Sequence, residues 1–191
     1  MIPGLPARQL GFWFPWLQPL KILTIGHSTR TLVQFIQLLQ SQGVRTLVDV
    51  RTIPRSRHNP QFNQETLPAA LKNAGLGYLH LKGLGGLRHP RPDSPNLGWR
   101  NASFRGFADY MLTPEFEDSL EELIKLAQAE GPVALMCAEA LPWRCHRSLI
   151  ADALLVRRLR VEHVLGPGKQ QPHTLTPWAK VEAGRISYPV V

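Results

Sequence analysis

A five-residue apolar run at positions 133–137, VALMC, is the feature that most restricts how this chain folds. It follows a Gly-Pro pair, which ends the helical pattern before it. A short strand without polar alternation is typical of a parallel sheet whose two faces are both covered by helices. The run therefore favours an α/β fold over an all-helical or a purely antiparallel one.

Five β-prone runs in all alternate with segments of helical periodicity. The predicted strands cover residues 21–26, 46–50, 78–81, 133–137 and 161–165. The predicted helices follow the capping residues Thr31, Thr66 and Thr113, and a last one covers about residues 145–158. Because parallel strands need right-handed crossovers, we predict a three-layer α/β/α sandwich. Its sheet is expected to be mainly parallel and Rossmann-like, with about five strands.

The chain has 191 residues, which is enough for one core but short for two ordinary domains. We expect a single α/β domain over residues 21–165, an N-terminal extension over residues 1–20 and a C-terminal tail over residues 166–191 packed on the domain. The extension is rich in aromatic residues and proline, is too short to span a bilayer and lacks a signal-peptide cleavage site. These features predict a cytoplasmic protein without a membrane span.

The chain carries 22 Lys and Arg against 14 Asp and Glu, which gives a formal net charge of +8. Such an excess favours a polyanionic partner or an anionic substrate, although a basic surface kept for solubility gives the same total. The two cysteines are too few for a disulfide scaffold. No Gly-x-Gly-x-x-Gly or Walker pattern occurs, so the sequence does not suggest NAD or ATP.

Polar residues gather just after three of the predicted strands, where sheets of this kind bind their ligands. They are His27, Ser28 and Arg30 after the first strand, Asp49, Arg51, Arg55, Ser56 and Arg57 in or after the second, and Cys137, Glu139, Arg144, Cys145, His146 and Arg147 after the fourth. Because parallel strands end at one edge of the sheet, we expect a common site at that edge.

Several of these residues lie in motifs that carry a resemblance to a known family. The motifs are GHSTR at 26–30, DVRTIPRSR at 49–57, FADYM at 107–111 and MCAEALPWRCHRSLIADAL at 136–154. Over about residues 21–189 the chain resembles the domain of unknown function 488 (DUF488) family. The resemblance implies a bacterial or archaeal α/β domain whose signature residues lie at the strand ends, and it brings no established activity.

Cys145 is the better candidate for a reactive thiolate. The helix expected to begin there would present a positive dipole, and Arg144, His146 and Arg147 add positive charge, so a low thiol pKa is expected. Cys137 is either a small buried side chain at a strand end or a redox or metal partner of Cys145.

Three further kinds of site use the same residues. The two cysteines with His146 and His27 could bind zinc, but the gap between the cysteines is longer than in a usual zinc knuckle, and we expect no resident cofactor. A reversible disulfide is the second option. A rhodanese-like or phosphatase-like loop is the third, but it would have five residues between Cys137 and Arg144 where this chain has six, and Glu139 would repel a phosphate.

Asp49 and Glu139 are the acids expected to act as base and electrostatic stabiliser on one substrate. Each could instead form a structural ion pair, Asp49 with Arg51 and Glu139 with Arg147. His27 has the ordinary pKa of a proton-transfer group, and its alternative is a hydrogen-bonded loop histidine.

A basic loop at residues 51–58 and basic residues within 83–105 could line a positive rim suited to phosphate groups. Aromatic residues interleaved with them could stack on bases, namely Phe62, Trp99, Phe104 and Trp143. We therefore expect a nucleic acid or a phosphorylated small molecule as partner.

The leading hypothesis is an enzyme that acts on a nucleic acid or nucleotide. The residues expected to be catalytic are His27, Asp49, Glu139 and Cys145. The residues expected to bind substrate or phosphate are Ser28, Arg30, Arg51, Arg55, Ser56, Arg57, Arg144, His146 and Arg147. Two alternatives remain open: a non-catalytic nucleic-acid-binding or regulatory module, and a thiol, sulfur-transfer or phosphatase-like enzyme.

Overall fold

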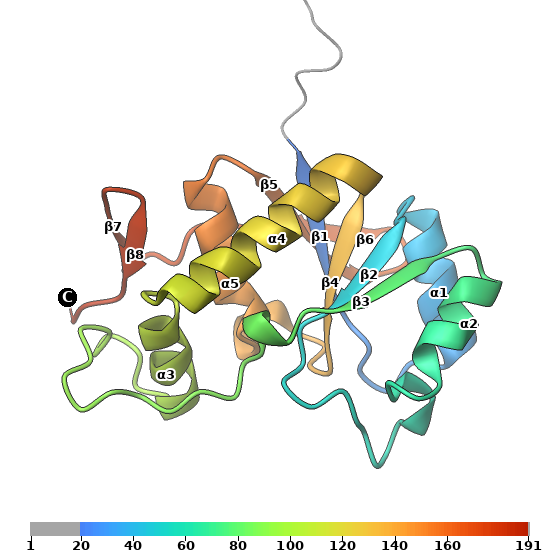
Figure 1. Ribbon diagram of the computed structural model, residues 1–191, viewed down its shortest axis with the longest axis horizontal. Coiled ribbons are helices and arrows are strands. Elements are labelled where there is room, and N and C mark those ends of the chain that lie inside the picture. Colours follow the sequence, from blue (N-terminus) through green and yellow to red (C-terminus); the bar gives the residue numbers. More distant parts are fainter. Residues whose placement is uncertain (1–19, 191) are drawn as a thin grey trace, which may run out of the picture.

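A computed structural model describes residues 20–190, and at its centre lies a six-stranded sheet with helices on both faces (Figure 1). The strands lie in the order β3-β2-β4-β1-β5-β6. They are β1 (Lys21–Gly26), β2 (Thr46–Asp49), β3 (Gly77–His80), β4 (Val133–Cys137), β5 (Arg160–Gly166) and β6 (Lys169–Pro172). The first five are parallel, and β6 pairs antiparallel with β5. The predicted sandwich with a mainly parallel sheet is therefore confirmed.

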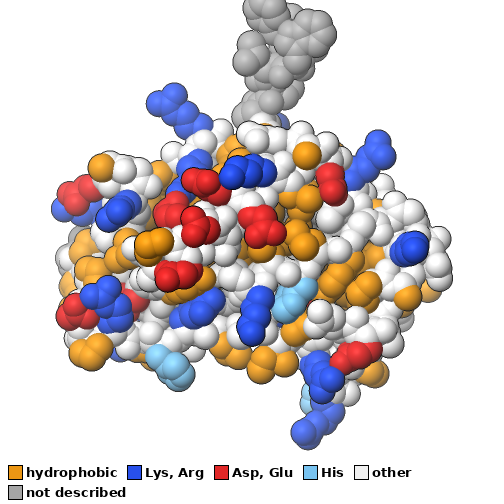
Figure 2. All heavy atoms as spheres, viewed as in Figure 1, with side chains coloured by type: hydrophobic (Ala, Val, Ile, Leu, Met, Phe, Trp, Pro, Cys, Tyr) orange, Lys and Arg blue, Asp and Glu red, His pale blue; other side chains and the backbone are white. Residues whose placement is uncertain are grey.

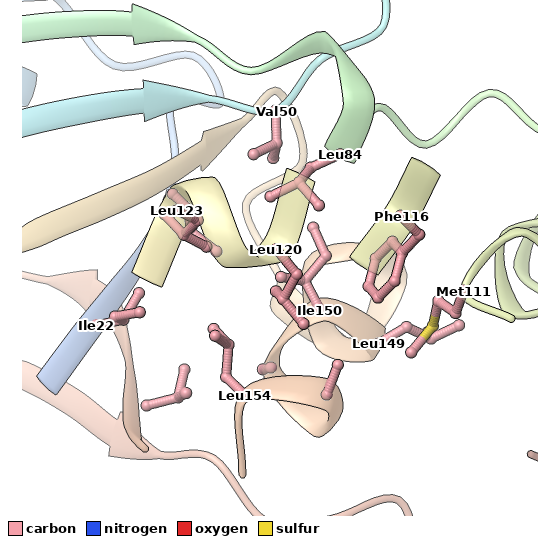
Figure 3. Packing of buried hydrophobic residues seen from close by; sticks show 14 of the residues in the cluster. Ile22, Val50, Leu84, Met111, Phe116, Leu120, Leu123, Leu149, Ile150 and Leu154 are labelled. Atoms are coloured by element: carbon pink, nitrogen blue, oxygen red, sulfur yellow. The ribbon is translucent and has the colours of Figure 1, made fainter. Parts of the chain in front are cut away.

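Each face of the sheet packs against its own hydrophobic core. The helices are α1 (Leu32–Ser41), α2 (Leu67–Asn73), α3 (Ala102–Tyr110), α4 (Pro114–Glu130) and α5 (Arg147–Val156), with 3₁₀ turns η2 (Pro60–Phe62), η3 (Lys82–Leu84) and η4 (Pro142–Arg144). On one face, Leu23 packs with Phe35 of α1 and Leu71 of α2. On the other, Ile22 packs with residues of α3, α4 and α5 (Figure 3). Neighbouring residues of β1 thus face opposite cores, as the pleat of a strand requires.

Capping side chains explain where two of the helices begin. Thr31 Oγ1 accepts a hydrogen bond from the Gln34 backbone N–H at 3.2 Å, and the Gln34 side chain accepts from Thr31 N–H, so the predicted capping box is present. Thr113 caps α4 as expected, with proline at the first helical position. Thr66 differs, because its hydroxyl donates to backbone carbonyls that precede α2 instead of accepting from the helix.

The C-terminal part of the chain is anchored to α5 by a buried carboxylate. Asp152 accepts hydrogen bonds from His173 Nε2 at 2.9 Å, from the backbone and hydroxyl of Thr176, and from Tyr188 O–H at 2.8 Å. This segment supplies β6 and a hairpin of β7 (Lys180–Glu182) and β8 (Arg185–Ser187). The extension expected over residues 1–20 lies outside the described residues, except for Leu20.

Charge is unevenly distributed over the molecule. α4 contains six of the chain's 14 acidic residues, and acidic side chains gather across the middle of the face that it covers (Figure 2). The net positive charge therefore resides on other elements, among them the loop that follows β2. Of the helices formed by residues 20–190, none combines the length and the apolar character that crossing a membrane requires.

Candidate active site

A cleft of about 640 Å³ opens at the carboxyl ends of β1, β2 and β4, where ligands of parallel sheets bind. Its floor is formed by the residues that follow β1 and by the loop between β4 and α5. Hydrogen bonds from His27 N to Cys137 O at 2.9 Å and from Ser28 N to Ala138 O at 3.0 Å join these two segments beyond the strand ends. The floor is thus a rigid continuation of the central sheet.

Gly26 allows the close approach of these two segments. A Cβ atom at this position would lie 1.9 Å from the backbone oxygen of Glu139, well inside van der Waals contact. The Glu139 carbonyl also accepts a hydrogen bond from the Arg147 guanidinium, so the loop is held from both sides. Only glycine leaves room for this arrangement, which places the residues after β4 against the end of β1.

Ten of the fourteen residues predicted for the site line the cleft. They are His27, Ser28, Arg51, Arg55, Ser56, Cys137, Glu139, Arg144, Cys145 and His146. The other four do not line it. Asp49 is buried against Arg51, and Arg147 is buried against Cys145. Arg30 donates to the backbone oxygens of Gly26 and Leu165. Arg57 is exposed to solvent and does not line the cleft.

Cys145 lies at the floor of the cleft between two nitrogen atoms. Its Sγ is 3.5 Å from His146 Nδ1 and 3.4 Å from Arg147 Nε, and the residue is 5% exposed. Cys137 Sγ is close as well, because the two sulfur atoms and a ring nitrogen of His146 lie within 4.8 Å of one another. One sulfur atom is therefore surrounded by a second thiol, an imidazole and a guanidinium.

The tautomer of His146 is fixed by a backbone carbonyl. Its Nε2 lies 3.0 Å from the Val50 oxygen, and because a carbonyl only accepts, Nε2 carries the hydrogen. In the neutral ring, Nδ1 then offers its lone pair to the Cys145 thiol. A cysteine, a histidine and an oxygen that orients the histidine form the usual arrangement for activating a nucleophile.

The surroundings of the two thiols shift their pKa values in opposite directions. A hydrogen bond from Cys137, followed by the effects of His146 and Arg147, holds the pKa of Cys145 well below its usual range despite burial. The same hydrogen bond, together with burial, raises the pKa of Cys137. The sequence predicted that the helix begins at about Cys145, but α5 begins at Arg147 and Cys145 precedes it in extended conformation. Its thiolate is favoured by these neighbouring side chains.

Asp49 holds Arg51 in place. The Arg51 guanidinium bonds to both carboxylate oxygens, at 2.9 Å from Nε to Oδ1 and 2.5 Å from Nη2 to Oδ2, and also donates to the Phe62 carbonyl. Tyr78 O–H donates to Asp49 at 3.0 Å. The structure thus shows the Asp49–Arg51 ion pair that the sequence left as an alternative. Within it, Arg51 is the partner that lines the cleft.

His27 is held as a neutral imidazole. Its Nδ1 lies 2.9 Å from the Ser28 oxygen and therefore carries the hydrogen, while Nε2 lies 3.5 Å from Arg51 Nη1. Burial, together with the charges of Arg51 and Arg147, lowers the pKa of His27. Ser28 has a φ of 50°, which is unusual for a residue other than glycine and orients the carbonyl that fixes the ring. His27 Nε2 is thus an unprotonated nitrogen close to the arginine.

Glu139 is oriented by its own loop. Its carboxylate accepts a hydrogen bond from Leu141 N at 3.2 Å. Among the residues that the structure describes, it forms no ion pair with Arg147, whose guanidinium donates instead to the Glu139 backbone oxygen. The carboxylate therefore lines the cleft without a fixed cation, and it is not the structural partner of Arg147.

The two cysteines and His146 could hold a soft metal ion such as zinc, because sulfur and imidazole are its preferred ligands. The positive charge of the Arg147 guanidinium opposes metal binding at this position. Arg147 is 1% exposed and its Nε–H donates to Cys145 Sγ, so a divalent cation would lie beside a buried guanidinium. The same guanidinium stabilises a free thiolate, and we derive no step through a metal.

Sequence reasoning missed two apolar residues of one wall of the cleft. Ile53 and Leu87 line it with 60% and 67% of their surface exposed, beside Phe104 of α3, which was expected from the sequence as a stacking side chain. Gly86 lies against His146, since a Cβ there would be 2.3 Å from His146 Nδ1. The Gly-Gly pair at 85–86 is the one signal in the sequence for this close approach. It gives no information on which side chain the backbone would approach.

Comparison with protein-family models gives a match to the domain of unknown function DUF488 over residues 31–154, which is more than half of the chain. No curated protein and no solved structure matches the chain. The matched residues include β2, β4 and most of the cleft, with both cysteines and the loop between them. The chain therefore belongs to the DUF488 family.

Proposed function

We propose that this protein is an enzyme that uses the Cys145 thiolate as a nucleophile on a phosphate-bearing substrate, either a nucleotide or the end of a nucleic acid. One observation carries the proposal. The Cys145 sulfur lies at the floor of an arginine-lined cleft, within hydrogen-bonding distance of both His146 Nδ1 and Arg147 Nε. This combines a nucleophile, a proton acceptor and charge stabilisation in one place.

The reaction would proceed by nucleophilic displacement. His146 Nδ1 takes the proton of Cys145, and the thiolate forms a bond to an electrophilic atom of the substrate. The leaving group departs with its electron pair and takes the proton back from His146. Water then attacks the same atom and gives a proton to a base, while the bond to sulfur breaks and the Cys145 thiolate is restored. Arg147 stabilises the thiolate before attack, and His27 Nε2 is a candidate base for the water.

The rim of the cleft supports an anionic substrate. Arg51, Arg55 and Arg144 line it, together with His58. Arg55 is paired with Glu65, but both side chains are more than half exposed, so the pair is weak and a phosphate can compete with it. Arg144 is exposed and has no acceptor among residues 20–190. Two arginines can therefore turn to a phosphate group.

The apolar wall supports a substrate that also carries a flat ring. Ile53, Leu87 and Phe104 face the same space as the arginines. A nucleobase has apolar faces, and stacking on an aromatic side chain contributes about 1–3 kcal/mol per base. An inorganic anion would leave this wall exposed. The combination of wall and rim favours a nucleotide unit over a simple phosphate.

Ligand protection tests the substrate class. Cys145 is alkylated with iodoacetamide in the presence of a nucleoside monophosphate, the matching nucleoside, inorganic phosphate or a short single-stranded oligonucleotide. We expect the monophosphate or the oligonucleotide to slow alkylation of Cys145, and the nucleoside to have little effect. Protection should also decrease as salt concentration rises, because it depends on phosphate contacts.

An arginine variant pair locates the phosphate contact. Arg144→Ala is expected to weaken protection at least about tenfold, because a hydrogen bond between charged groups contributes about 1.5–3 kcal/mol. Arg91→Ala is the matched control, since Arg91 is exposed, paired with Asp93 and does not line the cleft. Equal protection in both variants, or no protection by any phosphate compound, would contradict the proposed substrate class.

A further inference from the structure

Cys137 has no part in the displacement proposed above, yet it lies beside the nucleophile. The chain contains two cysteines, and the structure brings both into one cleft. Their sulfur atoms lie within 4.8 Å of each other, at the two ends of the loop between β4 and α5. A disulfide needs a sulfur–sulfur distance of about 2.05 Å, so the atoms would have to approach by less than about 3 Å.

We propose that Cys137 and Cys145 form a reversible disulfide on reaction with a peroxide, with Cys145 as the thiol that is attacked first and Cys137 as the resolving thiol. The inference rests on the Cys145 thiolate of the proposed function, but not on its phosphate-bearing substrate.

The two thiols differ in the way that such a pair requires. Cys145 is in contact with His146 and Arg147, which favour the thiolate, whereas Cys137 is the neighbour that donates to it. Peroxides react with thiolates, so the first oxidation falls on Cys145. Cys137, whose pKa is raised, keeps its proton until that step is complete. The order of the two steps thus follows from the environment of each sulfur.

The first step oxidises Cys145 by two electrons. Its thiolate attacks one oxygen of hydrogen peroxide, so a sulfur–oxygen bond forms and the oxygen–oxygen bond breaks. The departing hydroxide takes the proton that His146 received from the thiol and leaves as water. Cys145 is now a sulfenic acid, and the peroxide has been reduced.

The second step closes the disulfide. Cys137 sulfur attacks Cys145 sulfur, the sulfur–sulfur bond forms and the sulfur–oxygen bond breaks. The hydroxide that leaves takes the Cys137 proton and becomes a second water. One peroxide and two thiols therefore give one disulfide and two waters, and an added dithiol reverses the change by exchange. The disulfide removes the nucleophile, so the oxidised protein is expected to be inactive towards alkylation.

The sequence allows the oxidation state of each cysteine to be determined in a separate tryptic peptide. Trypsin cleaves after Arg144, which separates the two cysteines into different peptides. The full-length protein is treated with one equivalent of hydrogen peroxide and alkylated, with and without prior reduction by dithiothreitol. We expect free thiols to fall from two to none per chain, the two peptides to appear covalently linked within a monomer, and dithiothreitol to restore both thiols.

Two variants test the order of events. In Cys137→Ser, the sulfenic acid of Cys145 has no resolving thiol. Dimedone should therefore trap it, and without dimedone an excess of peroxide should oxidise it to sulfinic acid. In Cys145→Ser, Cys137 should react at least about tenfold more slowly than Cys145 does in Cys137→Ser, because burial still favours the protonated thiol.

Three outcomes would overturn the inference. They are sulfinic acid at Cys145 of the wild-type protein with Cys137 still free, equal oxidation rates in both variants, and a covalent dimer on a non-reducing gel.

Alkylation of untreated Cys145 at pH 6 separates this inference from the proposed function. If Cys145 reacts there but no disulfide forms, only the inference fails. If Cys145 is unreactive there, the thiolate itself is contradicted.

Discussion

Replacing Asp49 by asparagine is expected to lower the free energy of unfolding by about 3–5 kcal/mol, because Arg51 would remain as a buried charge without its counter-ion. The side chains of Arg51 and Asp49 are 5% and 0% exposed, so little water reaches the ion pair. Asparagine preserves the shape but offers one neutral acceptor. For a chain of this size the melting temperature should fall by roughly 6–20 °C.

Asp93→Asn is the matched control for this experiment. Asp93 also pairs with an arginine, Arg91, but the two side chains are 70% and 53% exposed. Exposed pairs contribute little, so we expect a change of about 0.5 kcal/mol or less in thermal or urea unfolding. Equal changes for Asp49 and Asp93 would mean that the buried pair does not anchor Arg51.

Gly26→Ala is expected to destabilise the protein by about 3 kcal/mol, at the upper end of the usual range for overpacking. The new Cβ would lie 1.9 Å from the Glu139 carbonyl, which is backbone and cannot rotate away. The loop after β4 would have to move, and with it the bond from Arg147 to that carbonyl. We therefore also expect slower alkylation of Cys145 in this variant.

Gly166→Ala provides the comparison for Gly26. Gly166 likewise ends a strand of the sheet, but a Cβ there would meet no atom within 4 Å. This change should leave stability unchanged or raise it by a few tenths of a kcal/mol, because alanine loses less backbone entropy on folding. Equal chemical-denaturation midpoints for the two variants would contradict the close approach at Gly26.

Helices and strands with a clear hydrophobic pattern in their own sequence were predictable. Those that form because of contacts with residues far away in the chain were not. The runs that became β1 and β4 have the bounds expected from sequence. α3 was missed because Gly106 interrupts its pattern, yet that glycine is needed where a Cβ would lie 2.5 Å from the Arg88 carbonyl. β6 is polar and contains Pro172. The feature of the sequence that indicates β6 is Gly168 in the turn before it, and this glycine has a φ of 64°.

The position of the cleft was predictable from the strand ends, but the contacts of the residues in and around it were not. Sequence placed Asp49 and Arg147 beside the other polar residues. It could not show that Asp49 turns to Arg51 and Tyr78, or that Arg147 is buried against Cys145. Asp49–Arg51 and Cys145–Arg147 are each only two residues apart, but the contact of Asp49 with Tyr78 and the burial of both arginines depend on segments far apart in the chain. A pattern along one strand or helix carries no information about them.

The pH dependence of Cys145 alkylation tests the proposed function most directly. The wild-type protein is exposed briefly to iodoacetamide between pH 4 and 9, and the Cys145 peptide is quantified separately from the Cys137 peptide after tryptic cleavage at Arg144. Because Cys137, His146 and Arg147 lower the pKa of Cys145, we expect the rate to reach its maximum at a pH well below that of an ordinary thiol and to fall as the pH is lowered further. A rate that rises through an apparent pKa of about 8.5, as for an ordinary thiol, would contradict the thiolate nucleophile.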